Sequence, residues 1–444
     1  AIADDGQMKC WGFGNSGRLG YGDTLNRGDS GGVRMGENLP FLDLGDGELV
    51  ESFATGALAG HSCVILTSGG LKCWGKNGNG QIGDESTTAE GNNQDEMGDF
   101  LAYVDLGNPS PRGTAKHVAI GALTTVVTLT SGGIVCFGDY SAYCYGDAVS
   151  RGSVPSTMGD YLPLMQLGTD GNGEQVTVVA AYAGDGHACA ILTTGKVKCW
   201  GMGSYLGYDD SLDRGVSDAS GLGDMLPVVD LGTGYMAKSL ALGFEHSCAL
   251  LEGGIVKCWG NGLQGQLGLG DASPRGQYET LTQMGAMLPQ VDLGDIGSVV
   301  QIGAGYSFSC ALFDTGGIKC WGDGTDGSTG HGDELARGTQ SSDMGNALSF
   351  VDLGDGAVAT SIAVGAYHVC VALADNTVKC WGQGSFAQLG LGNQSPRGAV
   401  AGQMGNSLDA VELGTLATTT KKTSTSTSSS TSLTSTSTST STST

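Results

Sequence analysis

Lysine and arginine are scarce in this chain of 444 residues. Only 21 basic residues stand against 45 acidic ones, which gives a formal net charge of -24. Such a surface repels phosphate backbones, so we expect neither a nucleic acid nor an anionic membrane as the partner. A purely solubilising role is the alternative interpretation, since an acidic surface also keeps protein molecules apart.

Long apolar runs and several common catalytic motifs are also missing. No stretch approaches the ~20 apolar residues that cross a bilayer, so the sequence predicts no direct membrane insertion. A phosphate-binding loop ending in Gly-Lys-Ser/Thr and the zinc motif His-Glu-x-x-His are both absent. The sequence therefore predicts a protein that is not an enzyme, with no cofactor, no metal and no catalytic residue.

What the chain does contain is a regular repeat. Cys-Trp-Gly or a close variant begins at Cys10, Cys73, Cys136, Cys199, Cys258, Cys320 and Cys380, at steps of 59 to 63 residues. Each period is then one supersecondary unit stacked on copies of itself. The 79 glycines are expected in tight turns between the strands of these units.

Ten of the 13 cysteines form five pairs with a constant separation of ten residues. The pairs are Cys63 with Cys73, Cys189 with Cys199, Cys248 with Cys258, Cys310 with Cys320, and Cys370 with Cys380. Two apolar runs joined by a turn lie between the members of each pair, which is typical of a β-hairpin. The hairpin places both sulfurs side by side at a non-hydrogen-bonded site, where a disulfide can form. Reduced core thiols are an alternative, whereas the Cys-x-x-Cys clusters typical of zinc sites are absent.

One repeat departs from this pattern. Val126 stands where its first cysteine should be, and an extra cysteine, Cys144, follows Cys136 by eight residues. The exchange suggests a local disulfide between Cys136 and Cys144, although two unpaired thiols are the alternative. Five or six disulfides imply an oxidising compartment, so we expect an extracellular or cell-surface protein of the secretory pathway.

A representative unit, residues 238–294, contains four short apolar segments separated by glycine-rich turns, as in a propeller blade. Its motifs Gly-x-x-His-Ser-Cys-Ala-Leu, Val-Lys-Cys-Trp-Gly and Gly-Gln-Leu-Gly lie between Gly243 and Gly268. This combination resembles the repeat of the regulator of chromosome condensation family and covers residues 1–414. The resemblance implies an all-β fold, a seven-bladed β-propeller of four-stranded blades.

The two ends of the repeat region predict an incomplete seam blade. Residues 1–12 align with residues 371–382, so the sequence opens halfway through a hairpin. We expect the rest of that hairpin, and a signal sequence, upstream of Ala1. Residues 416–419 resemble the opening strand at residues 358–362 and could supply one strand of the seam.

Residues 415–444 consist almost entirely of serine and threonine. Such a segment has too little apolar surface to offset the entropy cost of ordering, so we predict a disordered tail. In a secreted protein it would carry O-glycans as a stalk or linker. A bare low-complexity tail is the alternative.

Histidine and tryptophan recur at fixed places in the repeat. The histidines two residues before a cysteine are His61, His187, His246 and His368, and the tryptophans after a cysteine include Trp74, Trp200, Trp259, Trp321 and Trp381. A metal or nucleophile site and a ring of aromatic ligand platforms are the functional alternatives. Because a catalytic group occurs once and a framework residue recurs, we predict structural roles in hydrogen bonding and packing between blades.

An Arg-Gly pair recurs in the long loop of six repeats, while one repeat has Glu90-Gly91. The arginines are Arg27, Arg151, Arg214, Arg275, Arg337 and Arg397. They could bind a partner's carboxylates, since the guanidinium fork suits that group, or each could tie down its own loop. Acidic segments at residues 43–48 and 323–333 raise a calcium hypothesis, but neither has the spacing of a known calcium loop.

Repeat scaffolds carry many unrelated functions, so the motifs specify the fold more sharply than the role. The cysteine pairs, the acidity and the tail together favour an extracellular or cell-surface scaffold that binds a protein partner of unknown identity. The family resemblance also implies an alternative, a guanine nucleotide exchange factor for a small GTPase. A lectin-like carbohydrate binder is a third hypothesis.

Overall fold

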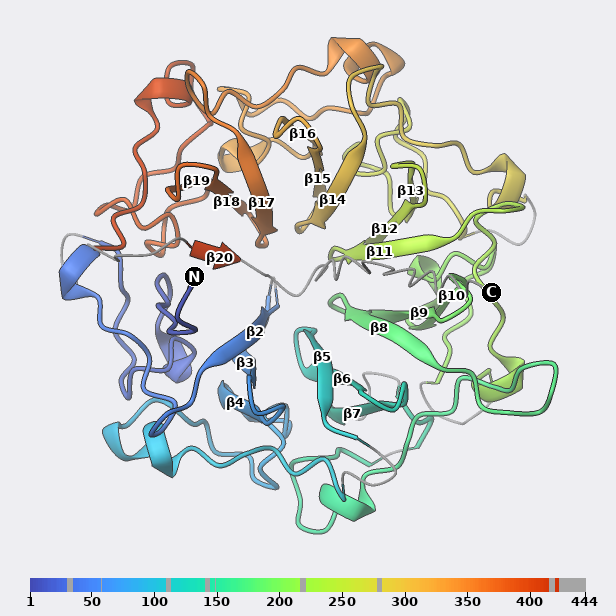
Figure 1. The fold of residues 1–444 in the computed structure, drawn as a ribbon. Helices are drawn as coiled ribbons and strands as arrows, with labels where there is room; N and C mark the ends of the chain where they lie inside the picture. The colour runs from blue at the N-terminus through green and yellow to red at the C-terminus, as the bar shows by residue number, and fades with distance from the viewer. Residues whose placement is uncertain are drawn as a thin grey trace, which may run out of the picture.

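The computed structural model describes residues 1–29, 35–56, 58–108, 113–139, 144–147, 149–215, 221–277 and 282–414, and the backbone of residues 420–422. Six antiparallel sheets of three strands each surround a central axis (Figure 1). Their strands are β2 (Val50–Thr55), β3 (His61–Leu66) and β4 (Leu71–Gly75); β5 (Ala115–Ile120), β6 (Thr124–Leu129) and β7 (Ile134–Gly138); β8 (Val178–Ala183), β9 (His187–Leu192) and β10 (Val197–Gly201); β11 (Ala237–Leu242), β12 (His246–Leu251) and β13 (Val256–Gly260); β14 (Val299–Ala304), β15 (Phe308–Phe313) and β16 (Ile318–Gly322); and β17 (Ala359–Val364), β18 (His368–Leu373) and β19 (Val378–Gly382). The predicted all-β class is confirmed.

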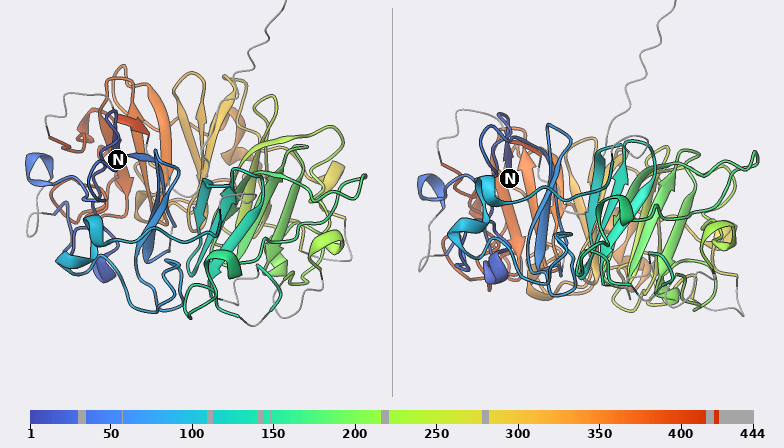
Figure 2. Two further views of the ribbon diagram at one scale, coloured as in Figure 1. Left: turned by 60° about the horizontal axis from the view of Figure 1, so that its bottom comes forward. Right: turned by 90° about the horizontal axis from the view of Figure 1, so that it is seen from below.

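The sheets stand side by side in a ring, with the first strand of each sheet nearest the axis (Figures 1 and 2). Helical structure among the described residues is limited to three-residue 3-10 turns in the loops. These turns are η1 (Asn15–Gly17), η2 (Gly36–Asn38), η3 (Gln94–Glu96), η4 (Gly98–Phe100), η6 (Gly159–Tyr161), η7 (Gly203–Tyr205), η8 (Gly223–Met225), η9 (Gly285–Met287), η10 (Thr325–Gly327), η11 (Ser341–Asp343), η12 (Gly345–Ala347) and η13 (Gly405–Ser407). The long connections between sheets are therefore irregular loops with short turns.

The core lies between neighbouring sheets. All six residues of β12 are buried, because one face of its sheet packs on the preceding sheet and the other on the following one. Trp259 is fully buried against the preceding sheet. Trp321, one repeat later, donates its indole N–H to the Gln266 carbonyl of the preceding unit at 3.0 Å. The recurring tryptophans thus lie where packing between blades was predicted.

The glycine of the Cys-Trp-Gly motif has a backbone reason to be glycine. Gly260 has a φ of +100°, and a Cβ there would approach the Glu245 carbonyl oxygen to 2.6 Å. A side chain would be strained in this conformation and would collide with that backbone. The motif therefore ends in glycine because the backbone of the neighbouring strand leaves no room for a side chain.

All five predicted hairpin disulfides are present, and so is the one between Cys136 and Cys144. In the hairpins the paired cysteines are direct cross-strand neighbours, for example Cys248 opposite Cys258 with their Cα atoms 4.1 Å apart. This short Cα separation is that of a non-hydrogen-bonded pair. Cys10 is the free cysteine among the described residues.

The predicted fourth strand of each blade differs in the structure. The corresponding segment is not a strand of the sheet, and a backbone hydrogen bond joins it to the third strand, such as that from the Val291 N–H to the Val256 carbonyl at 2.8 Å. The same bond recurs between Val104 and Leu71 and between Leu42 and Met8. Sheets of three strands with a hydrogen-bonded outer segment therefore replace the predicted four-stranded blade, and beside β19 this segment forms an isolated bridge, with Ala410 opposite Lys379.

The remaining sector of the ring contains both ends of the described chain (Figure 1). There β1 (Ile2–Ala3) pairs antiparallel with β20 (Thr420–Lys422), so the predicted incomplete seam is a two-stranded sheet. The Lys9 ammonium donates to the Leu413 carbonyl at 2.9 Å, and this bond joins the first repeat to the last. The predicted opening strand at residues 416–419, and the tail from residue 415 apart from β20, lie outside the described residues.

Candidate functional site

The arginine-containing loops begin where the third strand of each sheet ends. The glycine of the Cys-Trp-Gly motif and the loop arginine exchange backbone hydrogen bonds, as Gly201 and Arg214 do at 3.0 Å in both directions. Each arginine is thereby held in register with its own sheet. The fixed backbone then sets where the guanidinium can reach.

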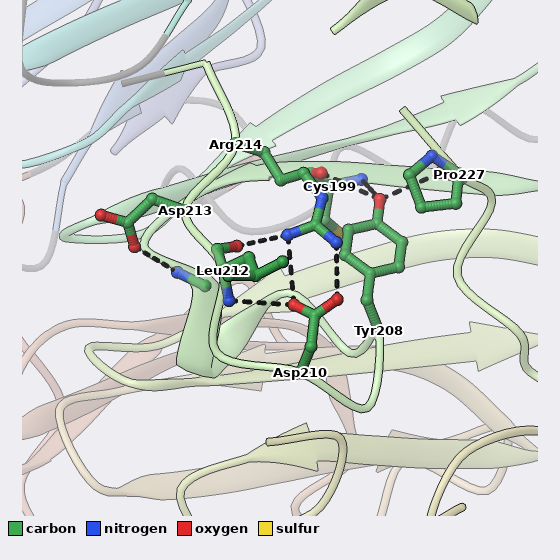
Figure 3. Close-up of polar contacts among 8 residues, drawn as sticks. Cys199, Tyr208, Asp210, Leu212, Asp213, Arg214 and Pro227 are labelled. Carbon is green, nitrogen blue, oxygen red and sulfur yellow. Dashed lines mark hydrogen bonds and ion pairs between the residues drawn. The ribbon is translucent and has the colours of Figure 1, made fainter. Parts of the chain in front are cut away.

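The arginine side chain folds back over its own loop (Figure 3). Both terminal nitrogens of Arg214 donate to the carboxylate of Asp210, four residues earlier, and one also donates to the Leu212 carbonyl. The guanidinium lies 4.9 Å from the centre of the Tyr208 ring. Planar, bidentate pairing of this kind fixes geometry as well as charge.

Five of the six arginines make this ion pair within their own loop. The pairs are Arg27 with Asp23, Arg151 with Asp147, Arg214 with Asp210, Arg275 with Asp271, and Arg337 with Asp333, at 2.6 to 2.8 Å. Hydrogen bonding to its arginine holds the pKa of Asp23 below the usual range, and the same holds for Asp147 and Asp333. These contacts agree with the interpretation in which each arginine holds its own loop. Binding of a partner's carboxylate by the arginines stays a prediction.

Two repeats lack the ion pair. Arg397 has Asn393 at the acidic position, and its guanidinium donates to the carbonyls of Ser395 and Pro396. Glu90 takes the arginine's place in the sheet of β2–β4 and keeps the backbone pairing with Gly75. Burial, followed by repulsion from Glu96 and Asp84, raises the pKa of Glu90 to about 7.

The tips of the ion-paired loops present aliphatic side chains to solvent. Leu25, Leu212 and Leu335 lie two residues before their arginines and are 55%, 58% and 66% exposed, and Val149 occupies the same place. In each loop the arginine binds the backbone carbonyl of this residue. A rigid backbone thus holds an exposed apolar side chain at the tip of four loops, which is a candidate contact surface for a protein partner.

The recurring histidines link neighbouring sheets. The Nε2 atoms of His61, His187 and His246 lie 2.8 to 2.9 Å from hydroxyl groups of the next sheet, on Thr125, Ser247 and Ser309 respectively. Burial lowers the pKa of His61 and His246 to about 3 and that of His187 to about 4. His368 carries the same motif beside the seam, and burial lowers its pKa to about 4.

Two further repeat residues escaped the sequence analysis. The lysine of the Val-Lys-Cys-Trp-Gly motif is buried, and its ammonium donates to two backbone carbonyls, as Lys257 does to Leu231 and Gly285. The Tyr208 hydroxyl accepts a hydrogen bond from the Cys199 N–H, and its one proton can be donated to the Cys199 or the Pro227 carbonyl, whose oxygens lie 2.9 and 3.1 Å away. Recurrence of Lys before each Cys-Trp-Gly was the available signal, whereas the tyrosine varies in position and identity.

Gly28-Asp29-Ser30-Gly31-Gly32 has the spacing of a serine nucleophile motif. That motif works at a turn from a strand into a helix of an α/β sheet, whereas Arg27–Asp29 belong to an irregular loop. Ser30 itself lies outside the described residues. The described residues contain no cluster of three acidic, histidine or cysteine side chains able to hold a metal ion, and no helix there could span a bilayer.

Comparison with known proteins gives a family model and several relatives. The model described as Regulator of chromosome condensation (RCC1) repeat matches residues 52–81, 178–205, 237–266, 299–328 and 359–388. The Ultraviolet-B receptor UVR8 of Arabidopsis thaliana is 27% identical over 341 residues, which are 76% of this chain and 66% of that protein. The human E3 ubiquitin-protein ligase HERC2 is 29% identical over 264 residues, which are 56% of this chain and 5% of that protein.

Solved structures show the same fold. Prp20p of Saccharomyces cerevisiae superposes with a TM-score of 0.67 at 17% identity, covering 93% of this chain and 87% of that one. Human WBSCR16 superposes with a TM-score of 0.65 at 16% identity, covering 91% and 93%. At 16–17% sequence identity, these superpositions show a shared β-propeller fold and do not indicate a shared function.

Proposed function

We propose that this chain, which contains repeats of the regulator of chromosome condensation family, is a non-catalytic protein-binding scaffold that works outside the reducing cytosol. The observation that carries this proposal is the set of ion-paired loops that hold Leu25, Val149, Leu212 and Leu335 exposed. Exposed apolar groups on a rigid frame lose little conformational entropy when a partner binds. The acidic surface around them favours a partner with a basic or neutral contact face.

The compartment is inferred from the cysteines. Six disulfides hold twelve of the 13 cysteines. Disulfides persist in secreted and cell-surface proteins and are reduced in the cytosol. We assign the protein to the extracellular space or the cell surface on this ground, with O-glycans on the serine and threonine tail.

Seven blades are proposed for the complete ring. Six are the three-stranded sheets, and the seventh is the seam sector, in which Leu42 bonds to Met8 as the outer segments do elsewhere. In this blade β20 takes the innermost place and β1 pairs with it. The same seam therefore closes the ring and joins its two ends.

Differential capture tests the scaffold proposal. A variant with Leu25, Val149, Leu212 and Leu335 changed to serine is compared with wild type on secreted and cell-surface proteins of the native source. A matched control changes Phe100, Tyr161, Met225 and Met287, which end 3-10 turns and are exposed by 67% to 77%. We expect at least one protein that wild type and control retain and that the loop variant loses by tenfold or more. Identical captured sets for all three proteins contradict the proposal.

Prp20p has been described together with its binding to Gsp1p and histones. The shared fold motivates an alternative function, that of a guanine nucleotide exchange factor. In that case the protein would accelerate nucleotide release from a small GTPase. Release of a fluorescent guanine nucleotide from purified GTPases, with and without this protein, separates the two functions. Acceleration of tenfold or more favours the exchange factor.

A further inference from the structure

Short turns of three residues join the first strand of a sheet to its middle strand. In the four sheets from β8 to β19 these turns are residues 184–186, 243–245, 305–307 and 365–367. Each turn begins with a glycine whose N–H donates to the carbonyl of the first residue of the middle strand, as Gly243 does to His246 at 2.9 Å. Because the first strands lie nearest the axis (Figure 1), the residues that follow these glycines gather around the centre of one face of the ring.

Three aromatic rings from successive turns stack on one another at this centre. The ring centres of Phe244 and Tyr306 lie 4.2 Å apart with an interplanar angle of 14°, and those of Tyr306 and Tyr367 lie 5.2 Å apart at 25°. A backbone hydrogen bond from the Tyr306 N–H to the Ala366 carbonyl, at 2.8 Å, fixes two of the turns to each other. All three aromatic residues are partly exposed. The stack is therefore a rigid aromatic surface that is open to solvent.

Two carboxylates lie beside the Phe244 end of the stack. Glu245 follows Phe244 in the same turn, and its carboxylate accepts hydrogen bonds from the Tyr205 hydroxyl at 2.8 Å and the Asn261 amide at 2.7 Å. Burial, followed by repulsion from Glu245, raises the pKa of Asp185 in the preceding turn. Among the described residues neither carboxylate has a basic ion-pair partner. This end of the stack thus holds negative charge that is not neutralised by a neighbouring cation.

The other end of the stack is acidic as well. Burial raises the pKa of Tyr367, and the nearby Tyr306, Asp323 and Asp326 raise it further. Two carboxylates have this effect on a phenol only from a short distance. Asp326 is held in place by a hydrogen bond from the Gln383 amide at 2.9 Å. Carboxylates therefore border the aromatic surface at both ends.

A hollow of about 20 Å³ adjoins the stack. Asp185, Phe244 and Tyr306 line it together, and much of the remaining wall is glycine backbone and aliphatic side chains such as Leu242 and Val364. Its lining comes from all six sheets and their turns, so the hollow lies at the ring axis. A space of this size holds about one water molecule. It therefore suits a compact ammonium group better than the planar guanidinium of arginine.

We propose that this aromatic and acidic surface binds a basic segment of a partner protein through a lysine side chain. The methylene stem of the lysine lies along the aliphatic wall of the hollow. Its ammonium group lies over the face of Phe244 that Tyr306 leaves open, and Asp185 supplies the opposite charge. This inference rests on the proposed function in that the partner is a protein. It uses none of the four loop-tip side chains, so the two proposals can fail separately.

The probe is a peptide with a single charge. Its sequence is Gly-Ser-Gly-Ser-Lys-Ser-Gly-Ser-Gly, with an acetylated amino end and an amidated carboxyl end. The ε-methylene protons of its lysine are followed by NMR as the protein is added. We expect a saturable upfield shift, because protons above the face of an aromatic ring experience its ring current. The same peptide with acetyl-lysine should bind at least tenfold more weakly, and the peptide with arginine at least threefold more weakly.

Matched variants separate the site from the general acidity of the protein. Asp185→Asn removes one charge and should weaken binding of the lysine peptide about three- to tenfold. Phe244→Leu keeps an apolar side chain, and it should weaken binding about two- to fivefold and reduce the upfield shift. The control is Asp46→Asn, which removes one charge from an exposed residue just before β2, at the opposite end of that strand from its turn. It should change binding by less than twofold.

Several results would overturn the proposal. One is the absence of a saturable shift with the lysine peptide, and another is equal binding of the lysine and acetyl-lysine peptides. Equal weakening by Asp185→Asn and Asp46→Asn would show attraction to the whole acidic surface. Displacement of the lysine peptide by a neutral oligosaccharide such as cellotriose would assign the surface to carbohydrate. Capture of a partner by the loop tips is measured separately, so it can succeed or fail whatever these peptides do.

Discussion

The Nε2 atom of His246 lies 2.9 Å from the hydroxyl of Ser309 across the junction between two neighbouring sheets. At the next junction Phe308 and Val369 take these places. The chain thus contains both a polar and an apolar solution to the same packing problem. In the first solution the hydroxyl gives the imidazole Nε2 a partner, and in the second both side chains are apolar. A mixture of the two would leave one polar group without that partner.

Ser309→Val alone should lower the free energy of unfolding by about 1–3 kcal/mol, because it leaves the buried imidazole of His246 without its hydroxyl partner. The double variant His246→Phe/Ser309→Val reproduces the apolar pair of Phe308 and Val369 at this junction. It should recover most of the lost free energy of unfolding. Urea unfolding of the wild type, the single variant and the double variant measures both effects. A double variant less stable than Ser309→Val contradicts the claim that the apolar pair can replace the polar pair as a unit.

Buried histidines should make stability depend on pH. The pKa is about 3 for His61 and His246 and about 4 for His187, below the value of 6.5 in the unfolded chain. Between pH 6.5 and about 4 the unfolded chain binds more protons, so the free energy of unfolding falls as pH falls. Each imidazole contributes about 1.4 kcal/mol per pH unit in this window.

Chemical unfolding at pH 7, 6 and 5 measures this slope. In the double variant His246→Phe/Ser309→Val, the free energy of unfolding should change less steeply with pH, because one buried imidazole has been removed. A slope that is the same in this double variant and in the wild type contradicts the prediction. The carboxylates paired with arginine lose their contribution only at still lower pH, because their pKa values lie below the usual range.

Two almost identical loops provide a reciprocal test of the arginine ion pair. Asp271 pairs with Arg275 in a loop that continues through Ser273 and Pro274. The equivalent loop before Arg397 has Asn393. We expect Asn393→Asp to raise the free energy of unfolding by about 0.5–1 kcal/mol and Asp271→Asn to lower it by a similar amount. Thermal unfolding at low and high salt measures both, and a gain from Asp271→Asn contradicts the account.

The repeat predicted the hairpins well, because cysteine spacing, the central turn and the apolar runs all act locally. The valine at position 126 and the extra Cys144 suggested a bond between Cys136 and Cys144, with two unpaired thiols as the alternative, and the bond is present. The fourth strand could not be judged in this way. The segment around Val291 has the composition of a strand, but it is joined to β13 by the hydrogen bond from Val291 to Val256 and is not a fourth strand of the sheet.

The site was predictable only in part. Recurrence identified His246 as a framework residue, yet its partner Ser309 comes from the next sheet and lies 63 positions away. The sequence marked the arginines and pointed to nearby carbonyls or aspartates as their loop partners, and the structure identifies the aspartate four residues earlier, as for Arg214 and Asp210.

Glu90 replaces the repeat's arginine and should destabilise the protein at high pH. Its pKa is raised to about 7 from 4.5, chiefly by burial. The folded state therefore holds a proton that the unfolded chain releases above pH 4.5, so stability falls as pH rises from 4.5 to 7. Glu90→Gln should raise Tm at pH 8 and give a much smaller gain at pH 5. An equal gain at both values of pH contradicts the assignment.

The most direct test of the disulfide-linked scaffold is thiol labelling of the protein isolated from its native source. The protein is unfolded without reductant, alkylated, and weighed by mass spectrometry before and after reduction. We predict that the twelve cysteines of the six disulfides stay unlabelled before reduction and are labelled after it. Labelling of all 13 cysteines without reductant contradicts both the disulfide framework and the assignment to an oxidising compartment.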